Sequence, residues 1–297
     1  MAGTVVCMPV RSVMIDDSFD LYRTTRALGV GFHVDGAWVL STHTPAGLAT
    51  MAVSPVTGGV QAEAWGSGGN LLLDRLPKML GLDDPGWNGP VPSPLRDLDA
   101  GSRGLRLGAS GVMYETAVKT VLGQLVTTRE SKTSFRKLMA GLGSEGLGPY
   151  PSVSAFPEPG VIATMGYEDL HSHGVERKRA SILVEVSRRA KRMEEALEMP
   201  KADAWRRLLA VDGVGPWTAA TLMGSVYGDR DAVIVGDYHL PNSVTWALAG
   251  EPRGDDDRML ELLEPFRPYR RRVTVMIKQA GIHAPKYGPR TAVRDHL

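Results

Sequence analysis

A Gly-Val-Gly turn at residues 213–215 is the feature that most constrains the fold of this chain. Apolar residues recur at helical spacing on both sides of the turn, so it joins two helices over 205–226. These residues are Trp205, Leu208 and Leu209 before the turn and Trp217, Ala220, Met223 and Val226 after it. Glycines let the backbone bend tightly and expose N–H groups at the start of the second helix, where the positive end of the helix dipole favours an anion such as phosphate. The candidate anion contacts are Gly213, Val214, Gly215 and Thr218.

The same turn has two other interpretations. A dinucleotide-binding loop needs a strand before the first glycine and a third glycine three residues after the second. Here an amphipathic helix precedes the turn and Thr218 occupies the place of the third glycine, which excludes that loop. The other interpretation is a helix hairpin that binds no ligand, and the residues that follow the hairpin argue against it.

Asp237 follows a short apolar run, 232–235, and stands just before another predicted helix. Pro241 must lie in the first turn of that helix, because proline is tolerated only there. An aspartate at such a place commonly caps the helix. Its carboxylate can also stabilise positive charge at a reacting centre and orient or deprotonate water. Next to an anion-binding hairpin, the second role is favoured.

The hairpin followed by an aspartate resembles the signature of the helix-hairpin-helix DNA glycosylases, and the chain looks most like their bacterial 3-methyladenine DNA glycosylase II type. A second block, YETAVKTVLGQLVT at 114–127, is similar to the family's helix with an I-L-G-Q-x-V motif. A third block, PFRPYR at 265–270, resembles the family's Pro-Trp-Arg segment. The three blocks stand in family order, and the resemblance runs over about 104–282.

The second block supplies the wedge that the resemblance implies. Leu125, with Gln124 beside it, would enter the DNA stack when a nucleotide is extruded. Without the resemblance, Leu125 would be interpreted as an ordinary core leucine, because it continues the apolar stripe of Val121 and Leu122 on a helix expected over 112–128.

By the same resemblance, Trp217, Tyr238 and Tyr269 would line the base pocket, where aromatic faces attract a cationic alkylated purine. The alternative for each is a place in the core, above all for Trp217. Tyr269 stands where the family has tryptophan, and Gly236 precedes Asp237 where related enzymes often have another acid. An oxidised base such as 8-oxoguanine therefore stays an alternative substrate.

The implied activity is that of a monofunctional DNA glycosylase, which hydrolyses the N-glycosidic bond of a damaged base with Asp237 as catalytic residue. Trp217 stands where bifunctional relatives carry a nucleophilic lysine, so no Schiff base and no strand cleavage are expected, and water is the nucleophile. The alternative class is a DNA-structure-binding protein of the same fold without catalysis. Asp237 argues against it, because a binder has no need of a carboxylate close to anionic DNA.

No catalytic metal or cofactor is expected. The single Cys7 cannot hold the four-cysteine iron–sulfur cluster of some family branches. His171 and His173 have no third ligand nearby, so a solvated loop is expected there. The resemblance leaves room for a structural monovalent cation at the hairpin. The run 255–257, of three aspartates, is expected to cap the following helix.

The net charge of +1 is too small for a nonspecific DNA binder, so a DNA footprint must be local. Two segments are rich in basic residues. The first holds Arg103, Arg106, Lys119, Arg129, Lys132, Arg136 and Lys137, and the second holds Arg267, Arg270, Arg271, Arg272, Lys278, Lys286, Arg290 and Arg294. Double-stranded DNA with damaged bases is the expected partner of a monomer.

The positions of proline and glycine, which mark turns and element boundaries, predict an α+β fold. Residues 1–82 are expected to form a small antiparallel sheet with two helices, and 83–104 a Pro/Gly-rich linker. Residues 105–282 are expected to form a mostly helical core of two lobes, and 283–297 a basic tail. The N-terminus lacks the charged start of a secretion signal and no run has the length of a membrane span, so a cytoplasmic, nucleoid-associated protein is expected.

Overall fold

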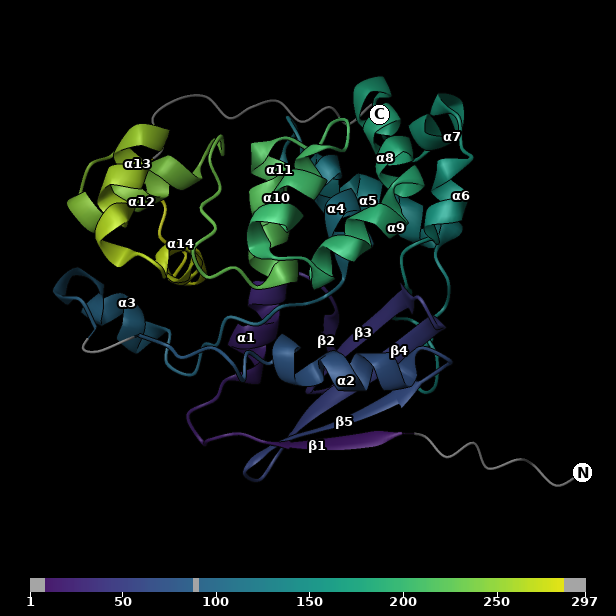
Figure 1. Ribbon diagram of the computed structural model, residues 1–297, viewed down its shortest axis with the longest axis horizontal. Coiled ribbons are helices and arrows are strands. Elements are labelled where there is room, and N and C mark those ends of the chain that lie inside the picture. The colour runs from purple at the N-terminus through teal and green to yellow at the C-terminus, as the bar shows by residue number, and fades with distance from the viewer. Residues whose placement is uncertain (1–8, 88–90, 286–297) are drawn as a thin grey trace, which may run out of the picture.

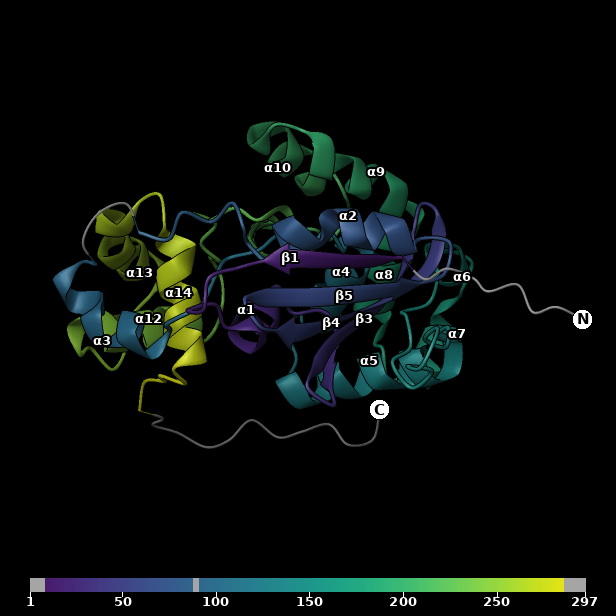
Figure 2. The ribbon, with the colours of Figure 1, turned by 90° about the horizontal axis from the view of Figure 1, so that it is seen from below.

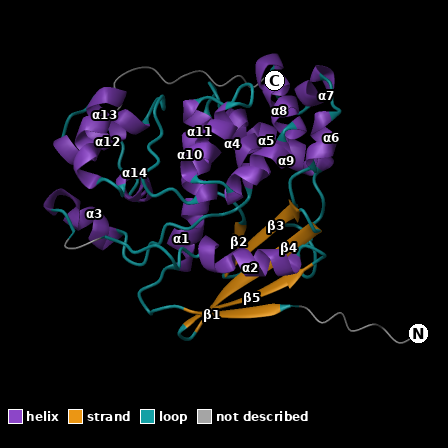
Figure 3. Cartoon of the chain, viewed as in Figure 1, coloured by secondary structure: helices purple, strands orange, loops and turns teal. Residues whose placement is uncertain are grey.

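The computed structural model describes residues 9–87 and 91–285, and its N-terminal part is an antiparallel sheet in the order β1-β5-β4-β3-β2 (Figure 1; Figure 3). The strands are β1 (Val10–Met14), β2 (Phe32–Val34), β3 (Ala37–Thr44), β4 (Gly47–Val56) and β5 (Gly59–Trp65). Alternate residues of β5, from Val60 to Ala64, are buried, as expected of a strand with one face on the core. The predicted sheet is present. The sequence pattern missed β2, which is too short to show a period of two.

Different parts of the chain cover the two faces of the sheet. The helices on one face are α1 (Leu21–Leu28) and α2 (Gly69–Met79). There Met51 of β4 packs with Leu72 and Leu76 of α2, all fully buried. A loop from the helical part covers the other face, where Val153 joins a small apolar cluster and Tyr150 meets Trp65 edge-on at 5.7 Å between ring centroids. The sheet is thus held against the helical core.

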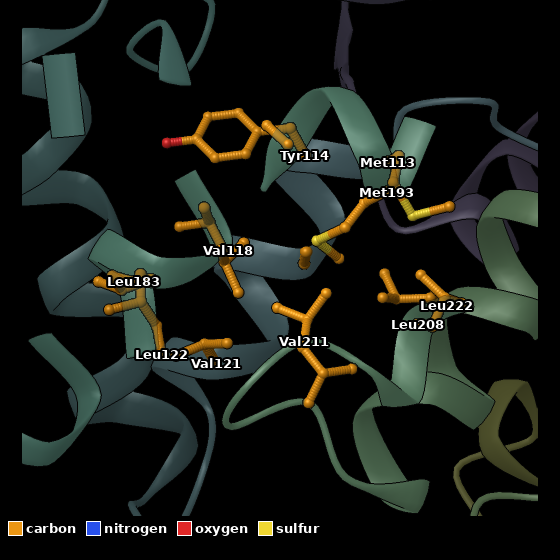
Figure 4. Packing of buried hydrophobic residues seen from close by; sticks show 14 of the residues in the cluster. Met113, Tyr114, Val118, Val121, Leu122, Leu183, Met193, Leu208, Val211 and Leu222 are labelled. Carbon is orange, nitrogen blue, oxygen red and sulfur yellow. The ribbon is translucent and has the colours of Figure 1, made fainter. Parts of the chain in front are cut away.

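The larger helical lobe contains the hairpin. Its helices are α4 (Met113–Leu122), α5 (Thr128–Leu142), α6 (Pro159–Ala163), α7 (Tyr167–Ser172), α8 (Arg177–Arg188), α9 (Ala190–Glu194), α10 (Lys201–Leu209) and α11 (Pro216–Leu222). A π-helical stretch, Met223–Tyr227, extends α11. Side chains from α4, α8 and the hairpin helices interdigitate in one core, among them Val118, Leu183 and Leu208 (Figure 4).

The smaller lobe lies at the other end of the molecule (Figure 2). Its helices are α3 (Arg96–Gly101), α12 (Leu240–Ala249), α13 (Asp256–Leu263) and α14 (Arg270–Gln279). Leu95 and Leu98, from the range expected as a linker, are buried in its core with Val273 of α14. This range therefore carries a helix and is a packed part of the lobe. A mostly helical α+β fold with two helical lobes and a small sheet, as predicted, is confirmed.

The sequence also predicts helices near 153–156 and 176–197, and these two, like the helix expected over 112–128, differ from the structure. The helix expected over 112–128 ends at Leu122, and a turn precedes α5. No helix forms over 153–156, because Ala155 pairs with Ser144 in an antiparallel bridge. The long helix expected over 176–197 breaks at Arg189, whose φ of −96° and ψ of 1° separate α8 from α9.

Candidate functional site

The hairpin turn between α10 and α11 contains two glycines with different surroundings. Gly213 has a φ of +84°, and a Cβ there would lie 2.5 Å from Cγ1 of Ile182, so only glycine fits. Gly215 has a φ of −84°, and a Cβ there would meet no atom within 4 Å. The N–H groups of both glycines donate to no other group of the described chain. They are therefore open to an external acceptor at the start of α11.

Two other candidate phosphate contacts lie beneath this surface, which corrects the sequence-based expectation. The Val214 N–H donates to the Val211 carbonyl at 2.9 Å, and the Val214 side chain packs in the lobe core. Thr218 is only 1% exposed, and its Oγ1 accepts a hydrogen bond from Gln124 Nε2 at 3.1 Å. Both residues support the turn from within, because the Val214 N–H and the Thr218 hydroxyl oxygen already have partners in the protein.

Gln124 joins the hairpin to the turn that carries the predicted wedge. Its Nε2 donates to the Gly213 carbonyl at 3.1 Å as well as to Thr218. On the other side of the turn, Thr127 and Glu130 form a capping box that starts α5. The turn is thus fixed at both ends, and its position relative to the hairpin is set by direct hydrogen bonds.

Leu125 lies at the tip of this turn and is 92% exposed. Its φ of 57° is in the left-handed region, which costs a residue with a Cβ roughly 1–2 kcal/mol. The alternative of a core leucine is therefore wrong, because α4 ends three residues earlier and turns Leu125 away from the stripe of Val121 and Leu122. A large apolar side chain held outward on a strained, anchored turn suits insertion into an apolar environment.

Asp237 is half-buried at the entry to α12 and uses both carboxylate oxygens. Oδ1 accepts from the backbone N–H groups of His239, at 2.8 Å, and Leu240, at 2.7 Å. Oδ2 accepts from the indole Nε1 of Trp217 at 3.3 Å. The carboxylate therefore lies beside the entry to α12, whose N-cap is His239, and binds two N–H groups there; it also touches the first turn of α11. It links the hairpin helix of the large lobe to a helix of the small lobe.

The three predicted pocket aromatics lie in different surroundings. Tyr238 is 85% exposed next to Asp237, with its ring edge-on to His239. Trp217 is partly buried and contacts the carboxylate directly. Tyr269 is only 9% exposed and packs edge-on against Trp87 at 5.8 Å between ring centroids. Tyr269 thus belongs to the packing of the small lobe, and the structure corrects its expected place in the pocket.

The C-terminal arginines are largely structural, which also corrects the expected DNA footprint. Arg270 forms an ion pair with Asp231 at 2.7 Å, and Arg272 pairs with the buried Asp84. Burial lowers the pKa of Arg271 to about 10, and its Nη1 has no hydrogen-bond partner among the described residues. Lys286, Arg290 and Arg294 lie outside the described residues.

In the first basic segment, some charges are paired and others are exposed. Arg106 pairs with Asp16, and Lys119 with Glu115 at 2.6 Å. Lys132 and Arg136 are exposed one helical turn apart on α5, the helix that follows the wedge turn. This exposed basic face is on the helix that directly follows the turn carrying Leu125.

The sequence pattern missed the carboxylates that fix the loop leading to Asp237. Asp231 holds the start of this loop to α14, and Asp256 accepts a hydrogen bond from the Gly236 N–H at 2.9 Å. The only sequence signal was the aspartate run at 255–257, and it gave no hint of a partner twenty residues earlier.

Metal and membrane features are absent from the described part of the chain. Residues 9–87 and 91–285 contain no cluster of three or more His, Cys, Asp or Glu side chains that could hold a metal ion. None of the helices in those ranges has the length and apolar character needed to cross a membrane. Cys7 lies outside them.

Comparison with known sequences gives two curated relatives, while no family model matches. The chain is 28% identical over 175 residues to DNA-3-methyladenine glycosylase 2 of Escherichia coli (strain K12), over 58% of this chain and 60% of the relative. It is 22% identical over 161 residues to YfjP of Bacillus subtilis (strain 168), over 53% of this chain and 55% of the relative. The matched region spans little more than half the length of these relatives.

Solved structures share the fold over nearly the whole chain. The 3-methyladenine DNA-glycosylase of Archaeoglobus fulgidus matches with a TM-score of 0.76 and 16% identity, over 90% of this chain and 96% of that one. The 8-oxoguanine glycosylase/lyase of Clostridium acetobutylicum in complex with double-stranded DNA matches with a TM-score of 0.66 and 13% identity, over 92% and 97%. The chain is thus similar in sequence to two proteins named as DNA-3-methyladenine glycosylases and shares its fold with solved DNA glycosylases.

Proposed function

We propose that this protein is a DNA glycosylase that extrudes a damaged base from duplex DNA and hydrolyses its N-glycosidic bond. The observation that carries the proposal is the position of the Asp237 carboxylate, which contacts the hairpin helix through Trp217. The same hairpin is tied through Gln124 to the exposed Leu125. One rigid unit therefore presents an anion-binding turn, an apolar wedge and a carboxylate.

The first step is extrusion of the nucleotide, which costs a few kcal/mol in lost stacking and pairing. In the proposal, the open N–H groups of Gly213 and Gly215 hold a backbone phosphate, and α5 adds positive charge beside it. Leu125 fills the space that the base leaves. Burial of a leucine side chain contributes about 1.5–3 kcal/mol, which is comparable to the cost of extrusion.

The second step is cleavage of the bond between base and sugar. As the bond breaks, positive charge develops at C1′ of the sugar and the base leaves with the electron pair. Asp237 stabilises this charge and orients or deprotonates the attacking water. Its two backbone hydrogen bonds and the indole bond hold the carboxylate in place before the substrate arrives. Trp217 offers no amine for a Schiff base, so the product is an intact abasic strand.

An alkylated purine is the proposed substrate. The Escherichia coli relative and the Archaeoglobus fulgidus neighbour are both named for 3-methyladenine. The exposed Tyr238 ring next to Asp237 supports this choice, since a desolvated cation–π contact with a cationic base contributes about 2 kcal/mol. An 8-oxoguanine substrate is the second candidate, because a glycosylase/lyase for that base shares the fold. A non-catalytic DNA-structure-binding protein is the third.

Double-stranded DNA in the nucleoid is the proposed partner of a monomer, and the proposed chemistry needs no metal or iron–sulfur cluster. A monovalent cation at the hairpin fits the donors that the turn supplies. The carbonyls of Val211 and Gly213 each accept one hydrogen bond and keep a second lone pair. When bound there, the ion would add positive charge beside the phosphate.

The test is a single-turnover assay on duplexes that carry 3-methyladenine, 7-methylguanine or 8-oxoguanine, followed by alkaline cleavage of abasic sites. We expect release of the alkylated purines, strand scission only after alkali, and no adduct trapped by borohydride. A trapped adduct would contradict the monofunctional mechanism. No release of any base, despite tight binding to damaged duplex, would favour the non-catalytic candidate.

A further inference from the structure

A second carboxylate acts on the loop that carries Asp237. This loop follows the π-helical stretch and ends at α12, and it turns just before Asp237 at Gly236, whose φ is +83°. The Gly236 N–H donates to Oδ2 of Asp256 at 2.9 Å. Because Gly236 directly precedes Asp237, this bond fixes the peptide plane at the bend from which the catalytic residue projects.

The three aspartates at the start of α13 have different contacts. Asp255 is the cap of α13, since its side chain accepts from the Arg258 N–H at 2.9 Å. Asp257 is exposed, and its side chain makes no hydrogen bond or ion pair within the described residues. Asp256 alone reaches out of its own helix, to Gly236. Capping of α13 therefore does not explain Asp256.

The environment of Asp256 is energetically unfavourable for a residue with only a helix-stabilising role. Its second oxygen, Oδ1, is shielded from solvent and accepts no hydrogen bond from the described chain. A buried polar atom without a partner destabilises a fold, so capping or charge at the start of α13 would not favour burying this carboxylate. The hydrogen bond to Gly236 is the contact that gives Asp256 a function.

The other end of the loop is fixed independently. Asp231 accepts from Arg270 through Nε at 2.8 Å and Nη2 at 2.7 Å, and it also pairs with Arg267. Asp237 directly follows the second anchor, at Gly236. The bond to Asp256 therefore controls the last turn of the backbone before the carboxylate.

We propose that Asp256 is a positioning residue that acts through Gly236 to hold the Asp237 carboxylate in the orientation needed for base release. This inference rests on the proposed function. A displacement of about 1 Å in a catalytic group can slow a reaction on the order of a hundredfold, so loss of one anchor is expected to slow the chemical step and leave DNA binding unchanged.

The test compares alanine variants of the three consecutive aspartates. Single-turnover base release at saturating enzyme, duplex affinity and melting temperature are measured for Asp255→Ala, Asp256→Ala and Asp257→Ala on 3-methyladenine duplex. We expect Asp256→Ala to slow release about tenfold with affinity unchanged, Asp255→Ala to lower only the melting temperature, and Asp257→Ala to match the wild type. Asp256→Asn should restore most of the rate, because its amide oxygen still accepts from Gly236.

Each other result overturns the inference in a recognisable way. Wild-type release rates for Asp256→Ala would show that the Gly236 bond does not position Asp237. Equal slowing by Asp255→Ala would mean that the stability of α13 alone matters. If Asp256→Ala does not fold, Asp256→Asn and Asp256→Ser decide between a retained and a lost acceptor. If the wild type itself releases no base, the proposed function fails first, and this inference falls with it.

Discussion

The wedge turn, 123–127, and the loop that ends at Asp237 differ in how firmly each holds the side chain that it presents. Both bend through a left-handed residue, but the bend falls on Leu125 itself in the first and on Gly236 in the second. Asp237 is held by three hydrogen bonds, whereas the Leu125 side chain is free and only the ends of its turn are anchored. The difference teaches that the proposed catalytic group is already fixed without DNA, while the proposed wedge is left exposed.

The sharpest way to break this comparison is Asp237→Asn. We expect base release to fall about a thousandfold, because the charge that stabilises the sugar cation is lost, and DNA binding to stay equal or strengthen, because a repulsion with phosphate is lost. Single-turnover rates and duplex affinities measure both. Asp257→Asn is the control for removal of an exposed acid nearby. A near-native rate for Asp237→Asn would refute the catalytic assignment.

A smaller effect is expected from Leu125→Ala, which removes the exposed leucine side chain and breaks no hydrogen bond. Base release should slow about tenfold through poorer extrusion, while affinity for undamaged duplex persists. Met14→Ala is the control, because Met14 is also apolar and 79% exposed but lies on the edge strand β1. If duplex affinity and the rate of base release fall together, Leu125 contributes to binding of the DNA backbone instead.

The smallest effect should come from Gly215→Val, which tests the grip without changing the chemistry. Its Cβ points into open space and its φ of −84° suits valine, so the fold should be unaffected. We expect duplex affinity to fall about fivefold for damaged and undamaged DNA alike, because the side chain blocks phosphate from the turn. Gly160→Val, another glycine with open space around its Cβ, is the control and should bind normally.

Gly213→Ala cannot replace that experiment. Its left-handed backbone and the close approach of Ile182 predict a loss of folding stability of roughly 1 kcal/mol or more, which a thermal melt would detect. Unchanged melting of Gly213→Ala would show that the turn is looser than its geometry implies.

Local signals in the sequence predicted the parts of the site that depend on local chemistry. The glycine pair marked the hairpin, and Pro241 marked the boundary beside Asp237. The end of α4 was missed although Gly123 follows it directly, because Leu125 and Val126 continue the apolar helical spacing of Val121 and Leu122, and this is why the helix was extended through Leu125.

Residues whose role depends on distant partners were not predictable in the same way. Arg270 and Arg272 lie in a segment rich in basic residues, which suggested DNA binding. Each instead forms an ion pair with an aspartate far away in the sequence: Arg270 with Asp231, 39 positions earlier, and Arg272 with Asp84, 188 positions earlier. Tyr269 was placed in the pocket by its motif, but Trp87 holds it in the core. Periodicity and motif order carry no information about such tertiary contacts. The roles of these side chains therefore became clear only from their burial in the structure.

The pairing of α14 with the first third of the chain also has a consequence for biosynthesis. Gln279 donates to the Arg23 carbonyl, 256 positions earlier, and Arg272 binds Asp84. Contacts between such distant positions form late, and a nascent chain folds from its N-terminus first. A chain still on the ribosome can therefore complete the hairpin before α14 emerges. The loop to Asp237 acquires its anchor on Arg270 only then, so the proposed catalytic carboxylate is fixed in place after the proposed phosphate-binding turn has formed.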